Sequence, residues 1–238
     1  CFGGYLINKD TPYTALARRS LMLLPREVMM PRLCDSRIGT VPVAFVKFSD
    51  REQEAKAVYY ACRWNLKPSD PAAFAAGKLT TPERPIVFYV DDTFPAGWYD
   101  AIRRGLLSWN AAFEKIGYRD AVQVRPYPRD DASFDPNDIK FSCVKYANTM
   151  GESLSSSARI DPRSGEILSA TICIPHNVTS RIRTDLFVQL GAADPDARRV
   201  KMSPELFGKA LAADVARHTG ACLGLAVNYA GSYCVPVD

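Results

Sequence analysis

A buried strand followed directly by an amphipathic helix constrains the fold of this chain more than any other feature. Residues 85–90 read Pro-Ile-Val-Phe-Tyr-Val, a continuous apolar run of the kind found in strands that are buried on both faces. From Trp98 to Ile116, apolar residues recur at intervals of three and four, and Gly117 is placed to end the helix. Together the two patterns predict a sheet that is covered by a helix.

More strands are expected on both sides of this unit. Strand-like runs cover residues 43–48, 58–66, 122–124, 139–146, 158–160 and 167–174. The first two runs are expected to pair as a hairpin, and the last two as a second hairpin across the tight turn at 161–165. Residues 68–82 are rich in Pro, Ala and Gly and are expected to form a surface loop.

Two helices are expected near the end of the chain, over residues 180–193 and 203–225. The second begins at Ser203-Pro204, where Ser suits the N-cap and Pro suits the first turn. We therefore expect an α+β fold with one twisted mixed sheet, built largely from residues 41–175 and packed by the helices at 98–116 and 203–225.

Composition excludes several classes of function. The 238 residues are 47% hydrophobic and 24% charged, which is ordinary for a globular domain. The net charge of +4 is spread along the chain, so we expect no nucleic-acid partner. The sequence contains no run of 18 apolar residues, so we expect no transmembrane segment. Only two histidines, His176 and His218, are present, so a site that needs three imidazoles is excluded.

Seven cysteines leave two alternatives open, and none of them is arranged as CxxC. They are either buried thiols that act as small apolar residues, or disulfides formed in an oxidising compartment. Cys1 stands where lipoprotein processing leaves a cysteine, which would provide a lipid anchor, but a fragment boundary gives the same first residue.

The most specific motif lies in the last expected helix. Residues 217–228 read Arg-His-Thr-Gly-Ala-Cys-Leu-Gly-Leu-Ala-Val-Asn, which resembles the elongated zinc motif H-E-x-x-H-x-x-G-x-x-H of metzincin-like peptidases. Gly224 occupies the glycine position of that motif. Further similar segments are Ser20–Pro25, Met30–Gly39, Arg63–Trp64, Pro85–Asp91, Trp109–Gly117, Asp161–Leu168, His176–Val178 and Pro236–Asp238.

On these segments, over about residues 20–238, the chain resembles a family of large secreted zinc-dependent metallopeptidases. The family carries domains of unknown function and is common in Bacteroidetes and related bacteria. The resemblance implies a zincin-like fold, with a lead-in segment at 1–40 and a metallopeptidase-like domain at 41–238. Since the chain stops at Asp238, we expect the methionine turn and the C-terminal subdomain to be missing from it.

The resemblance also implies a mechanism. Three histidines of the motif would hold zinc, and the glutamate beside the first would take a proton from the zinc-bound water. Here the ligand positions are Arg217, Ala221 and Val227, and the base position is His218. Ala and Val have no lone pair, and a protonated arginine repels a cation. We therefore expect none of these residues to be catalytic, and we expect the zinc to be lost.

His218 and Cys222 are four residues apart, which is the spacing of a ligand pair, and Cys234 follows. A relocated His/Cys metal site is one interpretation. The other is a core-facing histidine, favoured by an apolar stripe at helical spacing made of Phe207, Leu211, Val215, His218, Cys222 and Leu225.

Two further residues have competing interpretations. Arg217 either holds an anion in the former metal cleft, or pairs with an acid such as Asp214 or is simply solvated; the second interpretation is favoured. For His176, a structural hydrogen bond is favoured over catalysis, because no nucleophile or base partner is visible in the sequence.

From this resemblance we expect a catalytically inactive metallopeptidase-like domain, exported to the periplasm or cell surface, with an outer-membrane lipoprotein as one form of it. Its partner would be a peptide or protein of the cell envelope, bound along an edge strand, or it would serve a structural role there. The alternative is an active zinc endopeptidase, which the resemblance alone suggests and the four replaced positions argue against.

Overall fold

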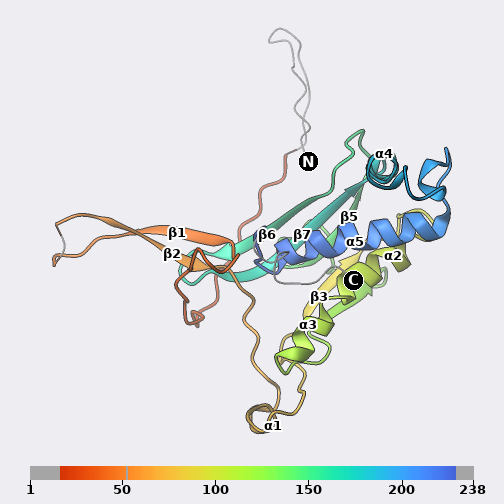
Figure 1. Ribbon diagram of the computed structural model, residues 1–238. Coiled ribbons are helices and arrows are strands. Elements are labelled where there is room, and N and C mark those ends of the chain that lie inside the picture. Colours follow the sequence, from red (N-terminus) through yellow and green to blue (C-terminus); the bar gives the residue numbers. More distant parts are fainter. Residues whose placement is uncertain (1–16, 52, 229–238) are drawn as a thin grey trace.

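The computed structural model describes residues 17–51 and 53–228. Its centre is a five-stranded mixed sheet with the order β4-β3-β5-β7-β6 (Figure 1). The strands are β3 (Ile86–Val90), β4 (Val122–Pro126), β5 (Ser142–Ala147), β6 (Ser155–Asp161) and β7 (Glu166–Pro175). Four strands run parallel, while β6 pairs antiparallel with β7 at one edge. The α+β class expected from the sequence is confirmed.

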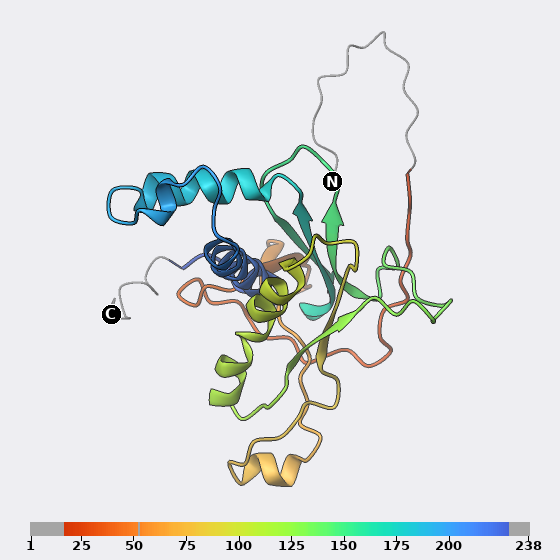
Figure 2. The same ribbon diagram turned by 90° about the vertical axis from the view of Figure 1, so that its right-hand side faces the viewer.

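Helices cover one face of this sheet. Helix α2 (Trp98–Leu107) and helix α5 (Pro204–Cys222) lie together on that face, and α4 (Val178–Leu190) lies beyond the end of β7 (Figure 2). A single 3-10 turn at Asp196–Arg198 precedes α5. The core between the layers is fully buried and includes Phe88, Ile102, Leu106, Ile172, Leu211 and Val215.

The two faces of β3 explain its continuous apolar sequence. Ile86, Phe88 and Val90 are buried beneath the helices. On the opposite face, Tyr89 contacts the rings of Phe134 and Phe141, which belong to the loop between β4 and β5. Because both faces are covered, every position in this strand favours an apolar residue.

The helix expected over 98–116 is divided in two. Helix α2 ends at Leu107 and α3 (Asn110–Lys115) follows after a break at Ser108. The side chain of Asn110 bonds both backbone groups of Val122, at 3.0 and 2.8 Å, which ties α3 to β4 instead of letting α2 continue.

The single sheet over 41–175 is a wrong expectation. Strands β1 (Pro42–Lys47) and β2 (Lys56–Ala61) form a separate two-stranded antiparallel sheet that projects from the rest of the molecule (Figure 1). The hairpin itself was expected. No residue of either strand is buried, so the strands lack the two covered faces that a place inside the five-stranded sheet requires.

The loop expected at 68–82 contains a short helix, α1 (Pro71–Ala75). Asp70 caps it by accepting a hydrogen bond from the backbone N–H of Ala73 at 2.9 Å. The expected surface loop therefore holds one helical turn that the Asp70-Pro71 dipeptide already signals.

Residues 17–40 run without a helix or a strand along the base of the β1–β2 hairpin. The backbone N–H of Cys34 donates to Tyr59 and that of Ala61 donates to Arg32, at 2.8 and 2.9 Å. Met29 is buried, whereas Leu21 and Leu23 are exposed. We call residues 17–40 the lead-in segment.

Two further findings concern the helices and the cysteines. Within the described ranges, no helix is long and apolar enough to cross a bilayer. Five cysteines lie in these ranges and carry free thiols, namely Cys34, Cys62, Cys143, Cys173 and Cys222. Two cysteines lie outside the described residues: Cys1, on which the lipid anchor depends, and Cys234, which the relocated metal site would include.

Candidate functional site

Helix α5 carries the motif positions, and its place in the fold is set by close packing on α2. Ser203 caps its start by accepting from the N–H of Leu206 at 3.1 Å. A methyl group on Gly105 of α2 would lie 2.4 Å from the carbonyl oxygen of Ala212, so only glycine permits this approach. Trp109 donates from Nε1 to the carbonyl of Ala216 at 2.8 Å, which fixes the same contact further along.

The end of α5 is equally fixed. Gly224 has a φ of +93°, and a Cβ there would lie 2.2 Å from the carbonyl oxygen of Cys62. Trp64 donates from Nε1 to the carbonyl of Cys222 at 3.0 Å. The chain then pairs with the lead-in segment, because the backbone N–H of Ala226 donates to the carbonyl of Gly39 at 2.9 Å. The turn at Gly224 thus follows α5, which ends at Cys222, three residues before the end expected at residue 225.

The four positions aligned with the zinc motif are not gathered into one pocket of donor groups. Arg217 and His218 lie on the last turns of α5, Ala221 is exposed, and Val227 is 78% exposed beyond the turn. In residues 17–51 and 53–228, no cluster of three His, Cys, Asp or Glu side chains is placed to hold a metal ion.

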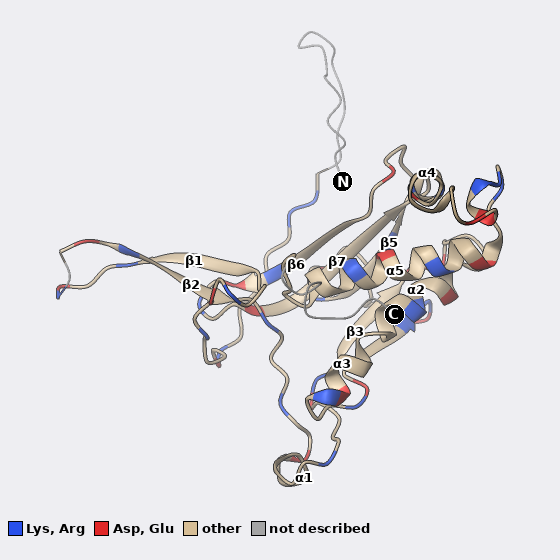
Figure 3. Ribbon diagram, viewed as in Figure 1, with Lys and Arg blue, Asp and Glu red and all other residues tan. Residues whose placement is uncertain are grey.

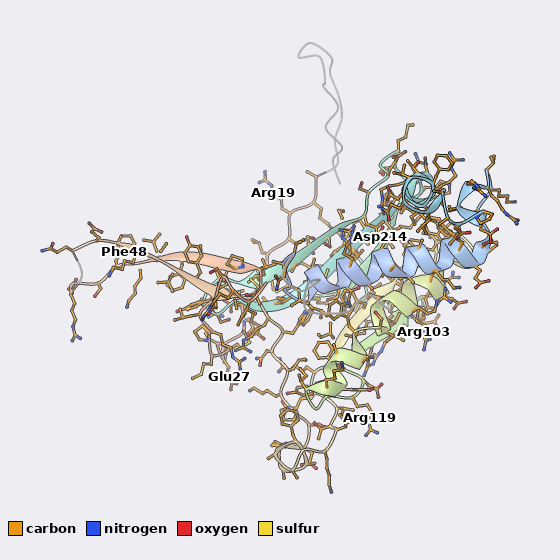
Figure 4. The ribbon with its side chains drawn as sticks, in the orientation of Figure 1. Arg19, Glu27, Phe48, Arg103, Arg119 and Asp214 are labelled. Atoms are coloured by element: carbon orange, nitrogen blue, oxygen red, sulfur yellow. The ribbon has the colours of Figure 1, made fainter. Side chains whose placement is uncertain are left out.

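Arg217 pairs with Asp214, the acid favoured from the sequence. Its Nη2 donates to Oδ1 of Asp214 at 2.8 Å, and its side chain is 68% exposed while that of Asp214 is 10% exposed. Asp214 also accepts from Arg181 of α4, which bonds Asp185 at 2.9 Å. Acidic and basic residues alternate along α5 in Figure 3, and Figure 4 labels Asp214 on the stretch of α5 near α4.

His218 is half-buried and joins α5 to the edge strand. Nε2 lies 3.1 Å from Nη2 of Arg217, and Nδ1 lies 3.1 Å from Oγ of Ser156 on β6. Because the guanidinium can only donate, we assign Nε2 as acceptor and Nδ1–H as the donor to Ser156. Burial, and then the charge of Arg217, lower the pKa of His218, so the ring is neutral near pH 7.

The stripe at helical spacing is buried only in part. Leu211, Val215 and Cys222 are buried, whereas Leu225 lies past the turn and is 41% exposed. Burial raises the pKa of Cys222 to about 12, so its sulfur is a neutral thiol that packs in the core. This arrangement favours the packing interpretation of His218 and Cys222 over a relocated metal site.

Strand β6 runs beside the last turns of α5 and has one unpaired edge. In the part of the chain that the structure describes, β7 is its only neighbouring strand. The backbone N–H groups of Ala170 and His176 donate to β5, to Oγ of Ser142 and to the carbonyl of Ala147. Even-numbered residues of β7 therefore face β5, and their partners on β6 face the open edge.

Ala158 is one of these partners, since it pairs with Ala170. Its backbone N–H and C=O are thus directed away from β7, along the edge where another strand would pair. A bulge between Arg159 and Ile160 ends the regular register just beyond it.

His176 lies at the end of β7 and is exposed. Its Nδ1 is 2.6 Å from the hydroxyl of Tyr146, and its ring stacks on Trp98 with 6.3 Å between centroids. The only side-chain hydrogen bond recorded for it in the described ranges is to a tyrosine, which fits the structural interpretation favoured from the sequence.

Sequence reasoning missed Ser156 and Arg181, which complete the contacts of His218 and Asp214. No local signal marks either residue, because each reaches α5 from another element. It also missed Glu166, a buried carboxylate at the start of β7, although a charged residue at the start of an apolar run is visible in the sequence.

Comparison with known families gives one match. Residues 4–69 match the family model of a domain of unknown function (DUF5117). Within the described ranges, that stretch holds the lead-in segment, β1, β2 and the extended residues that follow them. No curated protein and no solved structure matches the chain.

Proposed function

We propose that this chain is a metallopeptidase-like domain without a catalytic metal centre, which binds an extended peptide or protein segment along β6 in the bacterial cell envelope. The single observation that carries the proposal is the pairing of Arg217 with Asp214 and of His218 with Ser156. Both side chains that the zinc motif would use for chemistry are engaged in contacts within the domain.

The order of elements supports a zincin-like scaffold. Strand β3, helix α2, several strands and then the long helix α5 follow the order expected for the upper domain of zinc metallopeptidases. The motif positions lie at the end of α5, and Gly224 makes the turn that the motif assigns to its glycine.

The residues themselves support the loss of zinc chemistry. Ala221 and Val227 offer no donor atom, and Arg217 places a permanent positive charge where a ligand would lie. His218 occupies the general-base position, but it is already hydrogen-bonded at both ring nitrogens.

The open edge of β6 supports peptide binding. A segment that pairs with Ala158 would form backbone hydrogen bonds, as in other cases of strand addition. Such bonds depend on the shape of the backbone and not on one side chain, so a broad range of extended sequences would be accepted.

The first experiment separates the inactive domain from an active endopeptidase. Fluorescein-labelled casein is incubated with the full chain, with and without a chelator, and the metal content of the purified protein is measured. We expect intact casein and less than one equivalent of zinc. Chelator-sensitive cleavage together with one equivalent of zinc would refute the proposal and support the enzyme.

The second experiment tests the edge strand with the same labelled casein. Ala158→Pro removes the outward N–H while leaving the hydrogen bonds to β7 in place. We expect binding to weaken about tenfold, because one backbone hydrogen bond contributes about 1 kcal/mol and the proline ring adds a clash. Ala158→Ser keeps the N–H and is the matched control.

Hydrogen exchange provides an independent readout if the proline variant does not fold. In the wild-type chain, bound casein should slow exchange at the Ala158 amide and leave the amides of the buried β3 unchanged. Equal binding by the proline variant and equal exchange at Ala158 would exclude strand addition at this edge.

A further inference from the structure

A cleft of about 740 Å³ lies where the lead-in segment meets the sheet. Its walls come from residues between 23 and 30, from the extended stretch after β2, from residues 83–84 and from Glu166. Glu27, one of the lining residues, is labelled in Figure 4 near the base of the hairpin, well away from Asp214. The volume suits a small ligand or the end of a peptide.

The stretch after β2 alternates between two surroundings. Trp64 and Leu66 pack against the core, whereas Arg63, Asn65 and Lys67 line the cleft. Because side chains alternate along an extended backbone, the three polar side chains form a row along one wall of the cleft. The backbone of Arg63 bonds to that of Gly165 at 2.9 Å, which brings the row beside the start of β7.

Two buried polar atoms in this cleft have no partner. Glu166 is only 8% exposed, and its Oε2 has no hydrogen-bond partner within the described residues. Arg63 is its neighbour across a parallel bridge, and the buried Nε of Arg63 also lacks a partner there, although Nη2 donates to Met30. Unsatisfied buried groups are rare because each costs free energy, so an acid and a base that are unsatisfied side by side form a candidate binding site.

The charges around the cleft restrict what that ligand can be. The basic residues that line it are Arg26, Arg63, Lys67 and Arg84, and the acidic ones are Glu27, Glu83 and Glu166. A bare anion would leave the carboxylate of Glu166 unpaired, and a bare metal ion would lie among guanidinium and ammonium groups. A ligand with an ammonium and an oxygen acceptor close together satisfies both Glu166 and Arg63.

We propose that this cleft binds the α-ammonium end of an amino acid or a peptide, with the ammonium on Glu166 and the adjacent carboxylate or carbonyl oxygen on Nε of Arg63. Val28 and Met29 line the same cleft and supply apolar contact for the side chain of the ligand. The proposal is independent of strand addition at β6, which uses a different part of the sheet.

Calorimetric titration of the full chain with three probes tests the proposal. The probes are free alanine, trialanine, and trialanine that is acetylated at its amino terminus. We expect binding of alanine, of trialanine or of both, and none of the acetylated peptide. Binding of alanine assigns a free amino acid as the ligand, and binding of trialanine alone assigns a peptide terminus.

Glu166→Gln should reduce the affinity for the bound probe at least about tenfold, since it removes the charge that faces the ammonium. Glu114→Gln, on the exposed face of α3, is the matched control and should bind as the wild type does. Equal affinity for the acetylated peptide, or no binding of any probe up to about 10 mM, would overturn the proposal.

The melting temperature of the ligand-free protein gives a second readout. If Oε2 of Glu166 is unpaired without ligand, Glu166→Gln should melt at the same temperature as the wild type or higher. A fall of several degrees, about what 1 kcal/mol gives in a domain of this size, would show that Glu166 is a structural residue with a partner of its own.

Discussion

The cluster on α5 and the cleft beneath the lead-in segment contain similar residues in opposite states. On α5, Arg181 and Arg217 share Asp214, and His218 bonds Ser156. In the cleft, Arg63 and Glu166 are neighbours, yet each retains a buried atom that has no partner among the residues that the structure describes. The first set of contacts is closed within the domain, and the second is open.

The difference separates structural from functional polar groups. A closed network holds two helices and an edge strand together through polar groups that already have partners within the domain. An open pair lowers the stability of the free protein, and that stability is recovered only when a ligand binds to the pair. The motif positions on α5 therefore lie in the region whose polar groups already have partners.

The largest effect is expected on α5. Asp214→Ala removes the carboxylate that Arg181 and Arg217 share, although Arg181 keeps its bond to Asp185. We expect the free energy of unfolding to fall by about 2–3 kcal/mol in urea denaturation, since the charged hydrogen bonds from two arginines to a largely buried carboxylate are lost.

Arg217→Ala is the control for this variant, because the arginine is 68% exposed and an exposed ion pair contributes less than about 1 kcal/mol. Equal losses for the two substitutions would show that the cluster is not closed in the way described.

A second prediction compares two carboxylates that face each other across β6 and β7. Asp161 pairs in register with Glu166, is fully buried, and accepts from the side chain of Arg163 at 2.9 and 2.6 Å. We expect Asp161→Asn to cost about 2 kcal/mol at pH 7, whereas Glu166→Gln costs nothing.

The pH dependence of Asp161→Asn has a defined sign. The side-chain hydrogen bonds from Arg163 lower the pKa of Asp161 in the folded state. Its stabilisation is therefore complete above the unfolded pKa of about 3.9 and is lost as pH falls through the lower folded value. In denaturant titrations, the two proteins should converge near pH 2; a gap that persists in acid would contradict this account.

The smallest effect concerns His218. Burial and Arg217 lower its pKa, so the unfolded state binds more protons just below the unfolded pKa of about 6.5. Stability should decline as the pH falls from 7 through the folded pKa, and His218→Gln should decline less over the same interval. Parallel curves for the two proteins, measured by urea unfolding, would remove His218 from the contacts that hold β6.

Much of the fold follows from local patterns. The structure contains the strands and helices that local patterns predict, namely from the apolar run at 85–90, the tight turn at 161–165 and the cap at Ser203. The errors arose where distant contacts decide. Asn110 ends one helix and starts another through its bonds to Val122, and the β1–β2 hairpin stays apart because its faces are not covered.

The site was predictable only in part. The resemblance to the zinc motif aligns Arg217, Ala221 and Val227 with ligand positions, and side-chain chemistry excludes ligation by Ala and Val. It also pointed to Asp214 as a partner of Arg217, because residues three apart meet on a helix.

The tertiary structure decided what lies beside these residues. It brings Ser156 to His218 across 62 positions of sequence, and it sets Arg63 next to Glu166 across the bridge between an extended segment and β7. Whether a buried charge is paired depends on groups that are distant in sequence, so no local sequence pattern predicts the pairing. Residue identity determined what the end of α5 cannot bind, and packing alone showed that the open polar pair lies elsewhere.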